Sequence, residues 1–83
     1  MTEHGWTNAD TWHLQERVQT DQRLHAARQD MLDALGRAVT AGDVRRFFAE
    51  EMAGDPEAPV DFAQLAAEWE RERRFRRYLL GRS

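Results

Sequence analysis

The chain contains no cysteine, and all of its cationic side chains are arginines. The absence of cysteine excludes a disulfide framework and thiolate zinc sites, which often stabilise small domains. No alternation of apolar and polar residues bounded by turn residues occurs, so no β-strand is predicted. No apolar run approaches the ~20 residues of a membrane span, and no secretory signal pattern is found. We therefore expect a cytoplasmic protein that has no membrane partner.

A chain of 83 residues has the size of one domain, and we predict a single helical domain over residues 1–83. Within it we distinguish an N-terminal arm (1–7), a Pro-containing loop (54–60) and an Arg-rich helix end (70–83). A core of this size provides only about 3–5 kcal/mol of net stability. Good packing of large rings, self-association or a partner is therefore expected to contribute.

Helix caps and apolar periodicity predict an all-α fold, a small four-helix bundle. The predicted helices span about 9–19, 21–39, 43–53 and 62–80. Gly36 lies inside the second range and indicates either a close approach between helices or an early end. The predicted N-terminal caps are Asn8, Thr20 with Asp21, Thr40 in a capping box with Asp43, and Asp61; Gly54 and Gly81 are placed to end the third and fourth helices.

The apolar stripes of the second, third and fourth helices predict the core, because residues three and four apart share one helix face. In the last turns of the fourth helix, Arg73 and Arg76 occupy the positions of the stripe. The apolar residues Phe75 and Leu79 lie about 100° around the helix from it. That helix end is therefore predicted to project from the domain or to pack on something else. The stripe residues are Leu24, Ala27, Met31, Leu35, Ala38 and Val39, then Val44, Phe47, Phe48 and Met52, then Phe62, Leu65, Ala66 and Trp69.

Charge is distributed unevenly along the chain. Residues 70–83 carry six Arg and two Glu, a net charge of +4, which leaves −7 for residues 1–69. Such asymmetry indicates either a contact surface for a charged partner or the ordinary preference of cations for a helix C-terminus. Trp12 lies opposite the apolar side of the first helix, so it is predicted to be covered by another helix or by a second subunit. The candidate partner-binding residues are Trp12, Arg71, Arg74, Phe75, Arg77, Tyr78 and Leu79.

No arrangement of residues predicts a catalytic or metal site. His13 and Glu16 have the i, i+3 spacing of di-iron bundles, but those sites need carboxylates and such pairs on several helices. The other histidines are His4 and His25. No nucleophile elbow, zinc-protease motif or glycine-rich phosphate loop occurs. We therefore expect no enzymatic activity, no metal, no cofactor and no small-molecule substrate.

Two functions fit the Arg-rich helix end. Its arginines could contact phosphates while Phe75 and Tyr78 stack on bases, as in a nucleic-acid-binding protein. Against this, the chain is acidic overall, and Glu70 can pair with Arg73 and Arg74 on the same helix. A non-enzymatic protein-interaction module, self-associating or bound to a protein partner, is therefore preferred, and nucleic-acid binding is the alternative.

The segment Gly5-Trp6-Thr7-Asn8-Ala9-Asp10-Thr11-Trp12 resembles the Gly-Trp-x-Asn-x-x-Thr-Trp opening of a family of small uncharacterised proteins of phages, plasmids and microbial chromosomes. The similarity continues loosely over 20–24 and 60–69, whereas Glu16-Arg17 departs from the family's Leu-Trp. The resemblance implies no activity or cofactor. It implies an accessory or anti-defence role, exerted by binding a host or rival protein. The residues of the shared structural motif are Trp6, Asn8, Thr11, Trp12, Asp61 and Trp69.

Overall fold

The computed structural model contains four α-helices, and the described residues include no strand. The structure describes residues 5–6, 8–52 and 59–82. The helices are α1 (Ala9–Thr20), α2 (Gln22–Ala34), α3 (Ala41–Glu51) and α4 (Phe62–Arg82). The predicted all-α fold with four helices is confirmed. The predicted helix end at Gly54 and most of the predicted Pro-containing loop lie outside the described residues.

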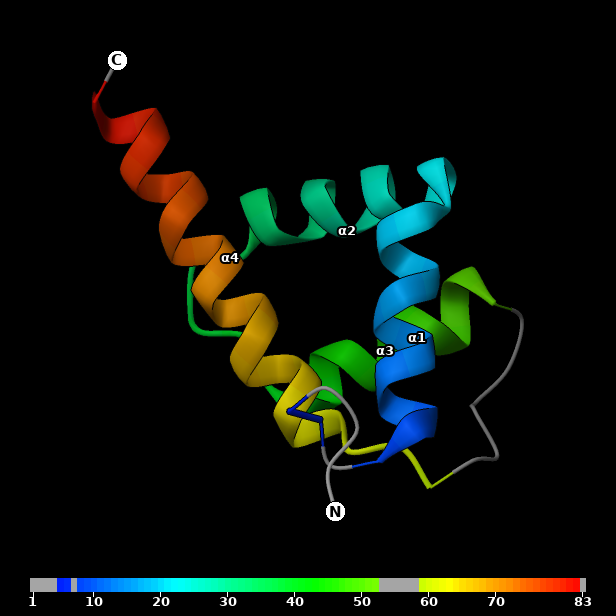
Figure 1. Ribbon diagram of the computed structural model, residues 1–83. Coiled ribbons are helices and arrows are strands. Elements are labelled where there is room, and N and C mark those ends of the chain that lie inside the picture. The colour runs from blue at the N-terminus through cyan, green and yellow to red at the C-terminus, as the bar shows by residue number, and fades with distance from the viewer. Residues whose placement is uncertain (1–4, 7, 53–58, 83) are drawn as a thin grey trace.

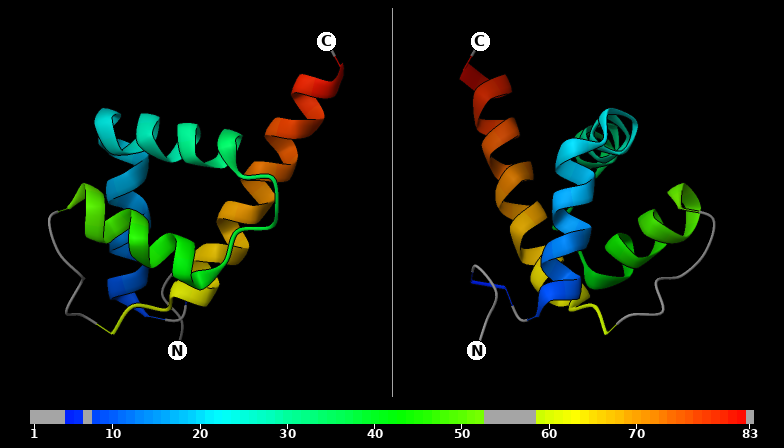
Figure 2. Two further views of the ribbon diagram at one scale, coloured as in Figure 1. Left: turned by 180° about the vertical axis from the view of Figure 1, so that it is seen from behind. Right: turned by 45° about the vertical axis from the view of Figure 1, so that its right-hand side comes forward.

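The helices are arranged around two diverging elements, α1 and α4. These helices begin side by side at one end of the molecule and separate along their lengths (Figure 1). α2 spans the open end between them, and α3 runs below α2 on the rear side (Figure 2). The C-terminal half of α4 extends beyond α2 (Figure 2). The end of α4 therefore projects, as the interrupted apolar stripe predicts.

The core is built around Trp69 and Phe48, whose side chains have no exposed surface. The rings of Phe47 and Trp69 meet edge to face, with centroids 5.2 Å apart and an interplanar angle of 89°. This geometry sets the positive edge of one ring against the negative face of the other. The remaining buried apolar residues are Val18, Leu24, Leu32, Val39, Val44, Leu65 and Ala66. The predicted stripes of α3 and α4 are confirmed, with Met52 and Phe62 half-buried against this core.

A hydrogen-bonded junction joins the starts of α1 and α4. Asn8 caps α1, because its Oδ1 accepts from the backbone N–H of Thr11 (2.9 Å) and from the Thr11 hydroxyl (2.8 Å). The Thr11 Oγ1 in turn accepts from the backbone N–H of Asp61 (2.8 Å). Asp61 caps α4 by accepting from the N–H of Gln64 (2.9 Å). Both predicted caps are confirmed, and the Thr11 hydroxyl connects them.

The start of α2 is capped by Asp21, whose Oδ1 accepts from the N–H groups of Arg23 and Leu24. Thr20 instead ends α1, and its hydroxyl donates to the carbonyl of Glu16 (2.9 Å). Of the two adjacent capping candidates, the aspartate is therefore correct and the threonine is wrong. The carboxylate can serve two orphan N–H groups at once, whereas the hydroxyl serves a carbonyl one turn back.

α2 ends at Ala34, well before the predicted end at Val39. Leu35 leaves the helix with an extended backbone (ψ 123°). Gly36 has no atom within 4 Å of the position that a Cβ would take, so it marks an early end and no close approach between helices. The connector is then held by the core, because the N–H of buried Val39 donates to Glu70 Oε1 (3.0 Å). Tertiary contacts thus override the continuing apolar stripe.

The boundaries of α3 and α4 differ less from the prediction. The predicted capping box is confirmed, with Thr40 and Asp43 each accepting from the backbone N–H of the other. α4 passes through Gly81, so the predicted helix end at that glycine is wrong. A glycine lowers helix stability by only about 1 kcal/mol, which one turn of an otherwise regular helix tolerates.

The row of residues that α2 buries shares only Leu24 with the predicted stripe of this helix. The buried side chains are Leu24, Arg28 and Leu32, which are spaced four apart. Ala27 and Met31, which belong to the predicted stripe, are half-buried on the adjacent row. Leu24 and Val39 are buried as predicted, but the rest of the stripe is wrong: Ala38 is exposed, and the buried row continues through Arg28 and Leu32, which the stripe did not include.

Candidate interaction surface

The C-terminal half of α4 carries four large apolar side chains that solvent reaches. Their exposed fractions are 57% for Phe75, 58% for Tyr78, 50% for Leu79 and 65% for Leu80. Phe75, Tyr78 and Leu79 stand at positions i, i+3 and i+4, so they share one face of the helix. We refer to these three residues as the apolar patch. Leu80 lies about 140° around the helix from Phe75, at 100° per residue.

Ion pairs explain why the patch turns outward. On the side of α4 that faces the core, Arg73 and Arg76 follow Trp69 and continue the row of the apolar stripe. Arg73 makes a bidentate pair with Glu70 (2.7 and 2.8 Å), and both side chains are nearly buried. Arg76 makes a bidentate pair with Asp33 on α2 (2.8 and 2.6 Å). Polar contacts thus hold this half of α4 to the bundle and leave its apolar residues uncovered.

Glu70 is the most constrained carboxylate of this helix. It accepts from the Arg73 guanidinium, from the N–H of Val39 and from the Nε of Arg74. These donors, with Arg73 first, lower the pKa of Glu70 from its ordinary 4.5 to about 2, although partial burial acts in the opposite direction. The carboxylate therefore stays ionised and ties α4 to the connector between α2 and α3.

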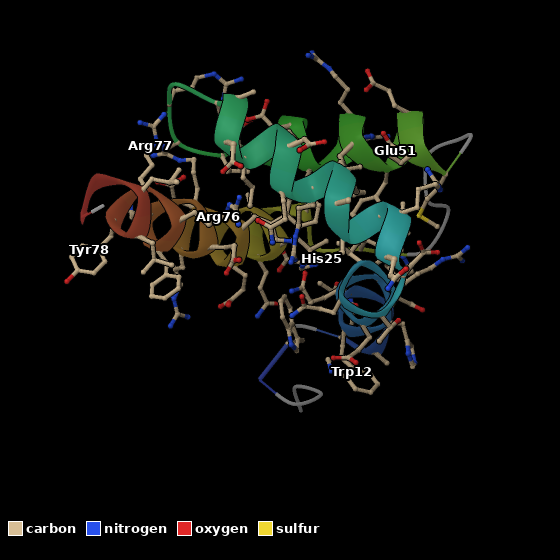
Figure 3. All side chains as sticks on the ribbon, turned by 90° about the horizontal axis from the view of Figure 1, so that it is seen from above. Trp12, His25, Glu51, Arg76, Arg77 and Tyr78 are labelled. Atoms are coloured by element: carbon tan, nitrogen blue, oxygen red, sulfur yellow. The ribbon has the colours of Figure 1, made fainter. Side chains whose placement is uncertain are left out.

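The predicted arginines of the site divide into two groups. Arg71 pairs with Glu68 (3.1 Å) and Arg74 with Glu70 (3.0 Å), yet 77% and 74% of these two side chains stay exposed. By helical position both flank the apolar patch. Arg77 lies on another side of α4 and donates to the carbonyl of Leu35 (2.8 Å) at the end of α2. Figure 3 shows Arg77 directed toward that end of α2, while Tyr78 points away from the bundle.

Trp12, the remaining predicted contact residue, lies on α1 and not beside the patch. Its ring is half-buried and is tilted against the ring of His13, with centroids 4.9 Å apart. Figure 3 shows it directed outward from α1. The structural motif is also divided: Asn8, Thr11 and Asp61 meet at the junction, while Trp6 and Trp69 pack in or against the core.

A buried polar layer between α1, α2 and α4 is absent from the sequence prediction. The indole N–H of Trp69 donates to Oε1 of buried Gln15 (2.9 Å). The Arg28 guanidinium lies 5.6 Å from the centroid of the same indole ring and donates to Gln19 (3.0 Å). Arg28 is 3% exposed, and its Nε has no acceptor in the part of the chain that the structure describes. Burial lowers the pKa of Arg28, and the charge of Glu72 acts against this effect.

One signal in the sequence points to part of this layer. A tryptophan predicted to be buried needs an acceptor for its indole N–H, because an unpaired buried donor costs free energy. Glutamine on the buried face of a neighbouring helix is a suitable acceptor, and Gln15 lies one turn from Val18 on that face of α1. No comparable local signal identifies Arg28.

A groove of about 230 Å³ lies between α2 and α3. Its apolar floor consists of Ala27, Met31, Leu35 and Phe47. The groove is smaller than the ~300 Å³ from which small-molecule sites begin, so it fits a protein side chain better than a cofactor. The charged residues of its rim are Arg37, Asp43, Arg46, Glu50 and Glu51.

Among the residues that the structure describes, no three His, Asp or Glu side chains gather in a way that could hold a metal ion. None of the four helices, over the same residues, has the length and apolar character needed to cross a membrane. No family model, curated protein or solved structure matches this chain. The family resemblance of the opening motif, the absence of enzymatic activity and the absence of a cofactor therefore stay predictions.

Proposed function

We propose that this protein is a non-enzymatic protein-interaction module that docks through the apolar patch and the flanking Arg71 and Arg74. The observation that carries the proposal is the exposure of Phe75, Tyr78 and Leu79, each at least half accessible, on a helix end that projects from the bundle. Aromatic side chains and arginine are enriched at the energetically important centres of protein interfaces. Single exposed apolar residues are ordinary, but three on one helix face form a contact surface.

The rigidity of the helix end supports the same function. Bidentate pairing of Arg76 with Asp33 and donation from Arg77 to the carbonyl of Leu35 hold α4 against α2 directly behind the patch. A surface that is already ordered loses little conformational entropy when a partner binds. The patch is therefore presented to a partner in a fixed geometry.

Nucleic-acid binding through the Arg-rich end of α4 is the second candidate. The observation in its favour is that Arg71 and Arg74 lie near Phe75 and Tyr78 on the same helix end and are about three-quarters exposed. Against it, all five arginines from Arg71 to Arg77 donate to carboxylates or carbonyls of the protein itself. A phosphate would have to compete with these acceptors, which weakens the case for a nucleic-acid site.

The resemblance of the opening motif indicates a biological setting for the proposed interaction. We propose an accessory or anti-defence protein of a phage or mobile element that acts in the cytoplasm by binding a host or rival protein, or a second copy of itself. No activity of the family identifies the partner, so the partner must be found by experiment.

Site-specific photo-cross-linking in the native host tests the proposal. A benzophenone side chain in place of Tyr78 is expected to give a discrete protein adduct, because the patch is the docking surface. The matched control carries the same side chain at Ala67, which is exposed on the first half of α4. Equal labelling from both positions, or adducts with nucleic acid alone from position 78, would contradict the proposal.

A further inference from the structure

The apolar patch is too small to hold a flat partner by itself. A large aromatic ring buries ~150–250 Å² in total, so Phe75 and Tyr78 at 57% and 58% exposure offer roughly 100 Å² each. A stable interface needs about 800 Å² from each partner. Leu80 is exposed on another side of the same helix end. A concave partner surface would cover both sides of the helix, whereas two patches stacked face to face would leave Leu80 in solvent.

The groove between α2 and α3 is a concave surface of suitable chemistry on this same chain. Its floor includes the half-buried side chains of Ala27, Met31 and Leu35 and the ring of Phe47. Covering partly exposed apolar groups is favourable in proportion to the area removed from water. The groove has room for a large side chain but is too small for a typical ligand. One ring of the apolar patch therefore fits the groove in both size and polarity.

Charge favours the pairing of these two surfaces over the pairing of two patches. The segment 70–83 carries +4 and the remainder of the chain −7, so the helix end of one copy is attracted to the body of another. The five charged residues of the groove rim sum to −1. Among them Glu50 is exposed and has no hydrogen-bond or ion-pair partner among the described residues. Two patches face to face would instead bring Arg71 and Arg74 of both copies together.

A single molecule cannot place its own patch in its own groove. Arg76 and Arg77 attach α4 to Asp33 and to the carbonyl of Leu35, so the patch is held facing away from the bundle. The groove is lined by residues of α2, of α3 and of the connector between them, and by none of α4. Contact between the two surfaces therefore requires two molecules.

We propose that the apolar patch of one copy docks in the groove between α2 and α3 of a second copy, so that the protein assembles head to tail. This inference rests on the proposed function, because it names the partner of the same surface. In this head-to-tail arrangement the second copy does not return its own patch to the groove of the first, so one patch and one groove stay free at the ends. Such assemblies grow with concentration, or close into a ring, and do not stop at a two-fold dimer.

Complementary variants test this arrangement by light scattering coupled to size exclusion. Ala27→Arg fills the groove, and Ala26→Arg places the same side chain on an exposed position of α2 as its control. Phe75→Glu removes the central ring of the patch, and Ala67→Glu is its control on α4. We expect the wild type and both controls to increase in mass with concentration, and each of the two interface variants to stay at the mass of one chain.

An equimolar mixture of Ala27→Arg and Phe75→Glu gives the sharpest result. The first variant keeps an intact patch and the second an intact groove, so the mixture is expected to form a species of two chains and nothing larger. Circular dichroism of each variant reports whether it folds. Glu50→Arg, an exposed change on the groove rim, serves as a second groove variant if Ala27→Arg is unfolded, and it is expected to weaken assembly severalfold.

Other outcomes overturn the inference and identify a different occupant. Assembly of Ala27→Arg and Glu50→Arg at the wild-type level, with Phe75→Glu monomeric, would mean that two patches pair with each other. A wild-type protein that stays at the mass of one chain up to about 1 mM would exclude self-assembly. A position-78 adduct with another protein would then leave the proposed function intact, and the lack of any such adduct would remove both.

Discussion

The indole of Trp69 makes three kinds of contact in the core. Its ring meets Phe47 edge to face, its N–H donates to Gln15, and the Arg28 guanidinium lies over its face. A single residue therefore links α4 to each of the other three helices. Both apolar burial and polar pairing depend on it.

We expect Trp69→Ala to lower the free energy of unfolding by about 3–5 kcal/mol, which approaches the whole stability of a domain this small. Phe48→Ala, which empties the neighbouring site, is expected to have an effect of similar size. Phe75→Ala is the control, because its ring is 57% exposed and its loss should change stability by less than about 0.5 kcal/mol. Urea denaturation measures all three, and a loss below about 1 kcal/mol for Trp69→Ala would mean that the ring is not a core residue.

Replacing Arg28 is expected to change the free energy of unfolding little, despite the central position of this residue. Its guanidinium is buried, its Nε is unpaired among the described residues, and its pKa is lowered by burial. Replacing a buried charge by an apolar side chain of similar length is often neutral or stabilising. Arg28→Met should therefore leave the free energy of unfolding within about 1 kcal/mol of wild type or raise it. A loss above about 2 kcal/mol in urea denaturation would show that the contact with Trp69 and Gln19 outweighs the cost of burial.

At the scale of the helices, Thr11 joins two elements through one hydroxyl group. That hydroxyl donates to Asn8 Oδ1 and accepts from the N–H of Asp61. Thr11→Val keeps the shape but leaves the N–H of Asp61 without its acceptor, so we expect a loss of about 1–3 kcal/mol in unfolding free energy. Thr20→Val is the matched control, because that hydroxyl serves only an exposed helix carbonyl. Equal losses of unfolding free energy in the two variants would contradict the role of the Thr11 hydroxyl in joining α1 to α4.

Glu70 makes the attachment of α4 dependent on pH. Its pKa in the folded state is about 2, below the 4.5 of the free side chain, so the unfolded chain binds the proton more readily. The stabilisation is complete above about pH 4.5 and is lost as the pH falls toward 2. We expect the unfolding free energy to decrease across this window, and Glu70→Gln to decrease less steeply. Denaturant unfolding at several pH values measures the two slopes, and identical slopes would contradict this role of Glu70.

Helix starts were predictable from the sequence, and the end of α2 only in part, because Gly36 left an early end and a close approach between helices both open. A cap such as Asn8 or Asp61 acts on N–H groups two or three residues away, so the local sequence contains the whole signal. The path of the connector after α2 depends instead on Glu70, which lies 31 residues from Val39 and accepts its N–H. Periodicity places Val39 on the stripe of α2, but it cannot show that a distant carboxylate accepts the N–H of Val39 outside the helix.

At the scale of the whole molecule, the projecting patch could be anticipated and the groove could not. Phe75 and Leu79 leave the core stripe of α4 at positions that the helical period alone reveals. The groove exists because Met31 and Phe47 approach from different helices, and no local pattern states how α2 and α3 are placed. The arginines are an intermediate case. The ion pairs of Glu70 within α4 follow from the i, i+3 and i, i+4 spacing of its partners. The hydrogen bond from Arg77 to the carbonyl of Leu35 can be predicted only when the placement of α4 against α2 is known.

The response of nucleic-acid binding to salt separates the two candidate functions. Four phosphate contacts on duplex DNA would make log K fall with log salt at a slope near −3.6, because each neutralised phosphate releases counterions. Arg71 and Arg74 are the arginines to test, since they are about three-quarters exposed and their loss should change stability by less than about 0.5 kcal/mol. Arg77 is unsuitable, because its removal would also free the carbonyl of Leu35.

We expect only weak binding of duplex DNA or RNA at physiological salt, because the protein's own carboxylates and carbonyls already engage these guanidinium groups. Fluorescence anisotropy across a range of salt concentrations measures the slope for the wild type and for the Arg71→Ala, Arg74→Ala double variant. Phe75→Glu is expected to abolish protein contact, whereas the double variant should weaken it less, because the apolar rings and not the exposed charges supply most of the buried area. Tight binding of nucleic acid whose slope flattens by about two in the double variant would instead assign the helix end to phosphate recognition.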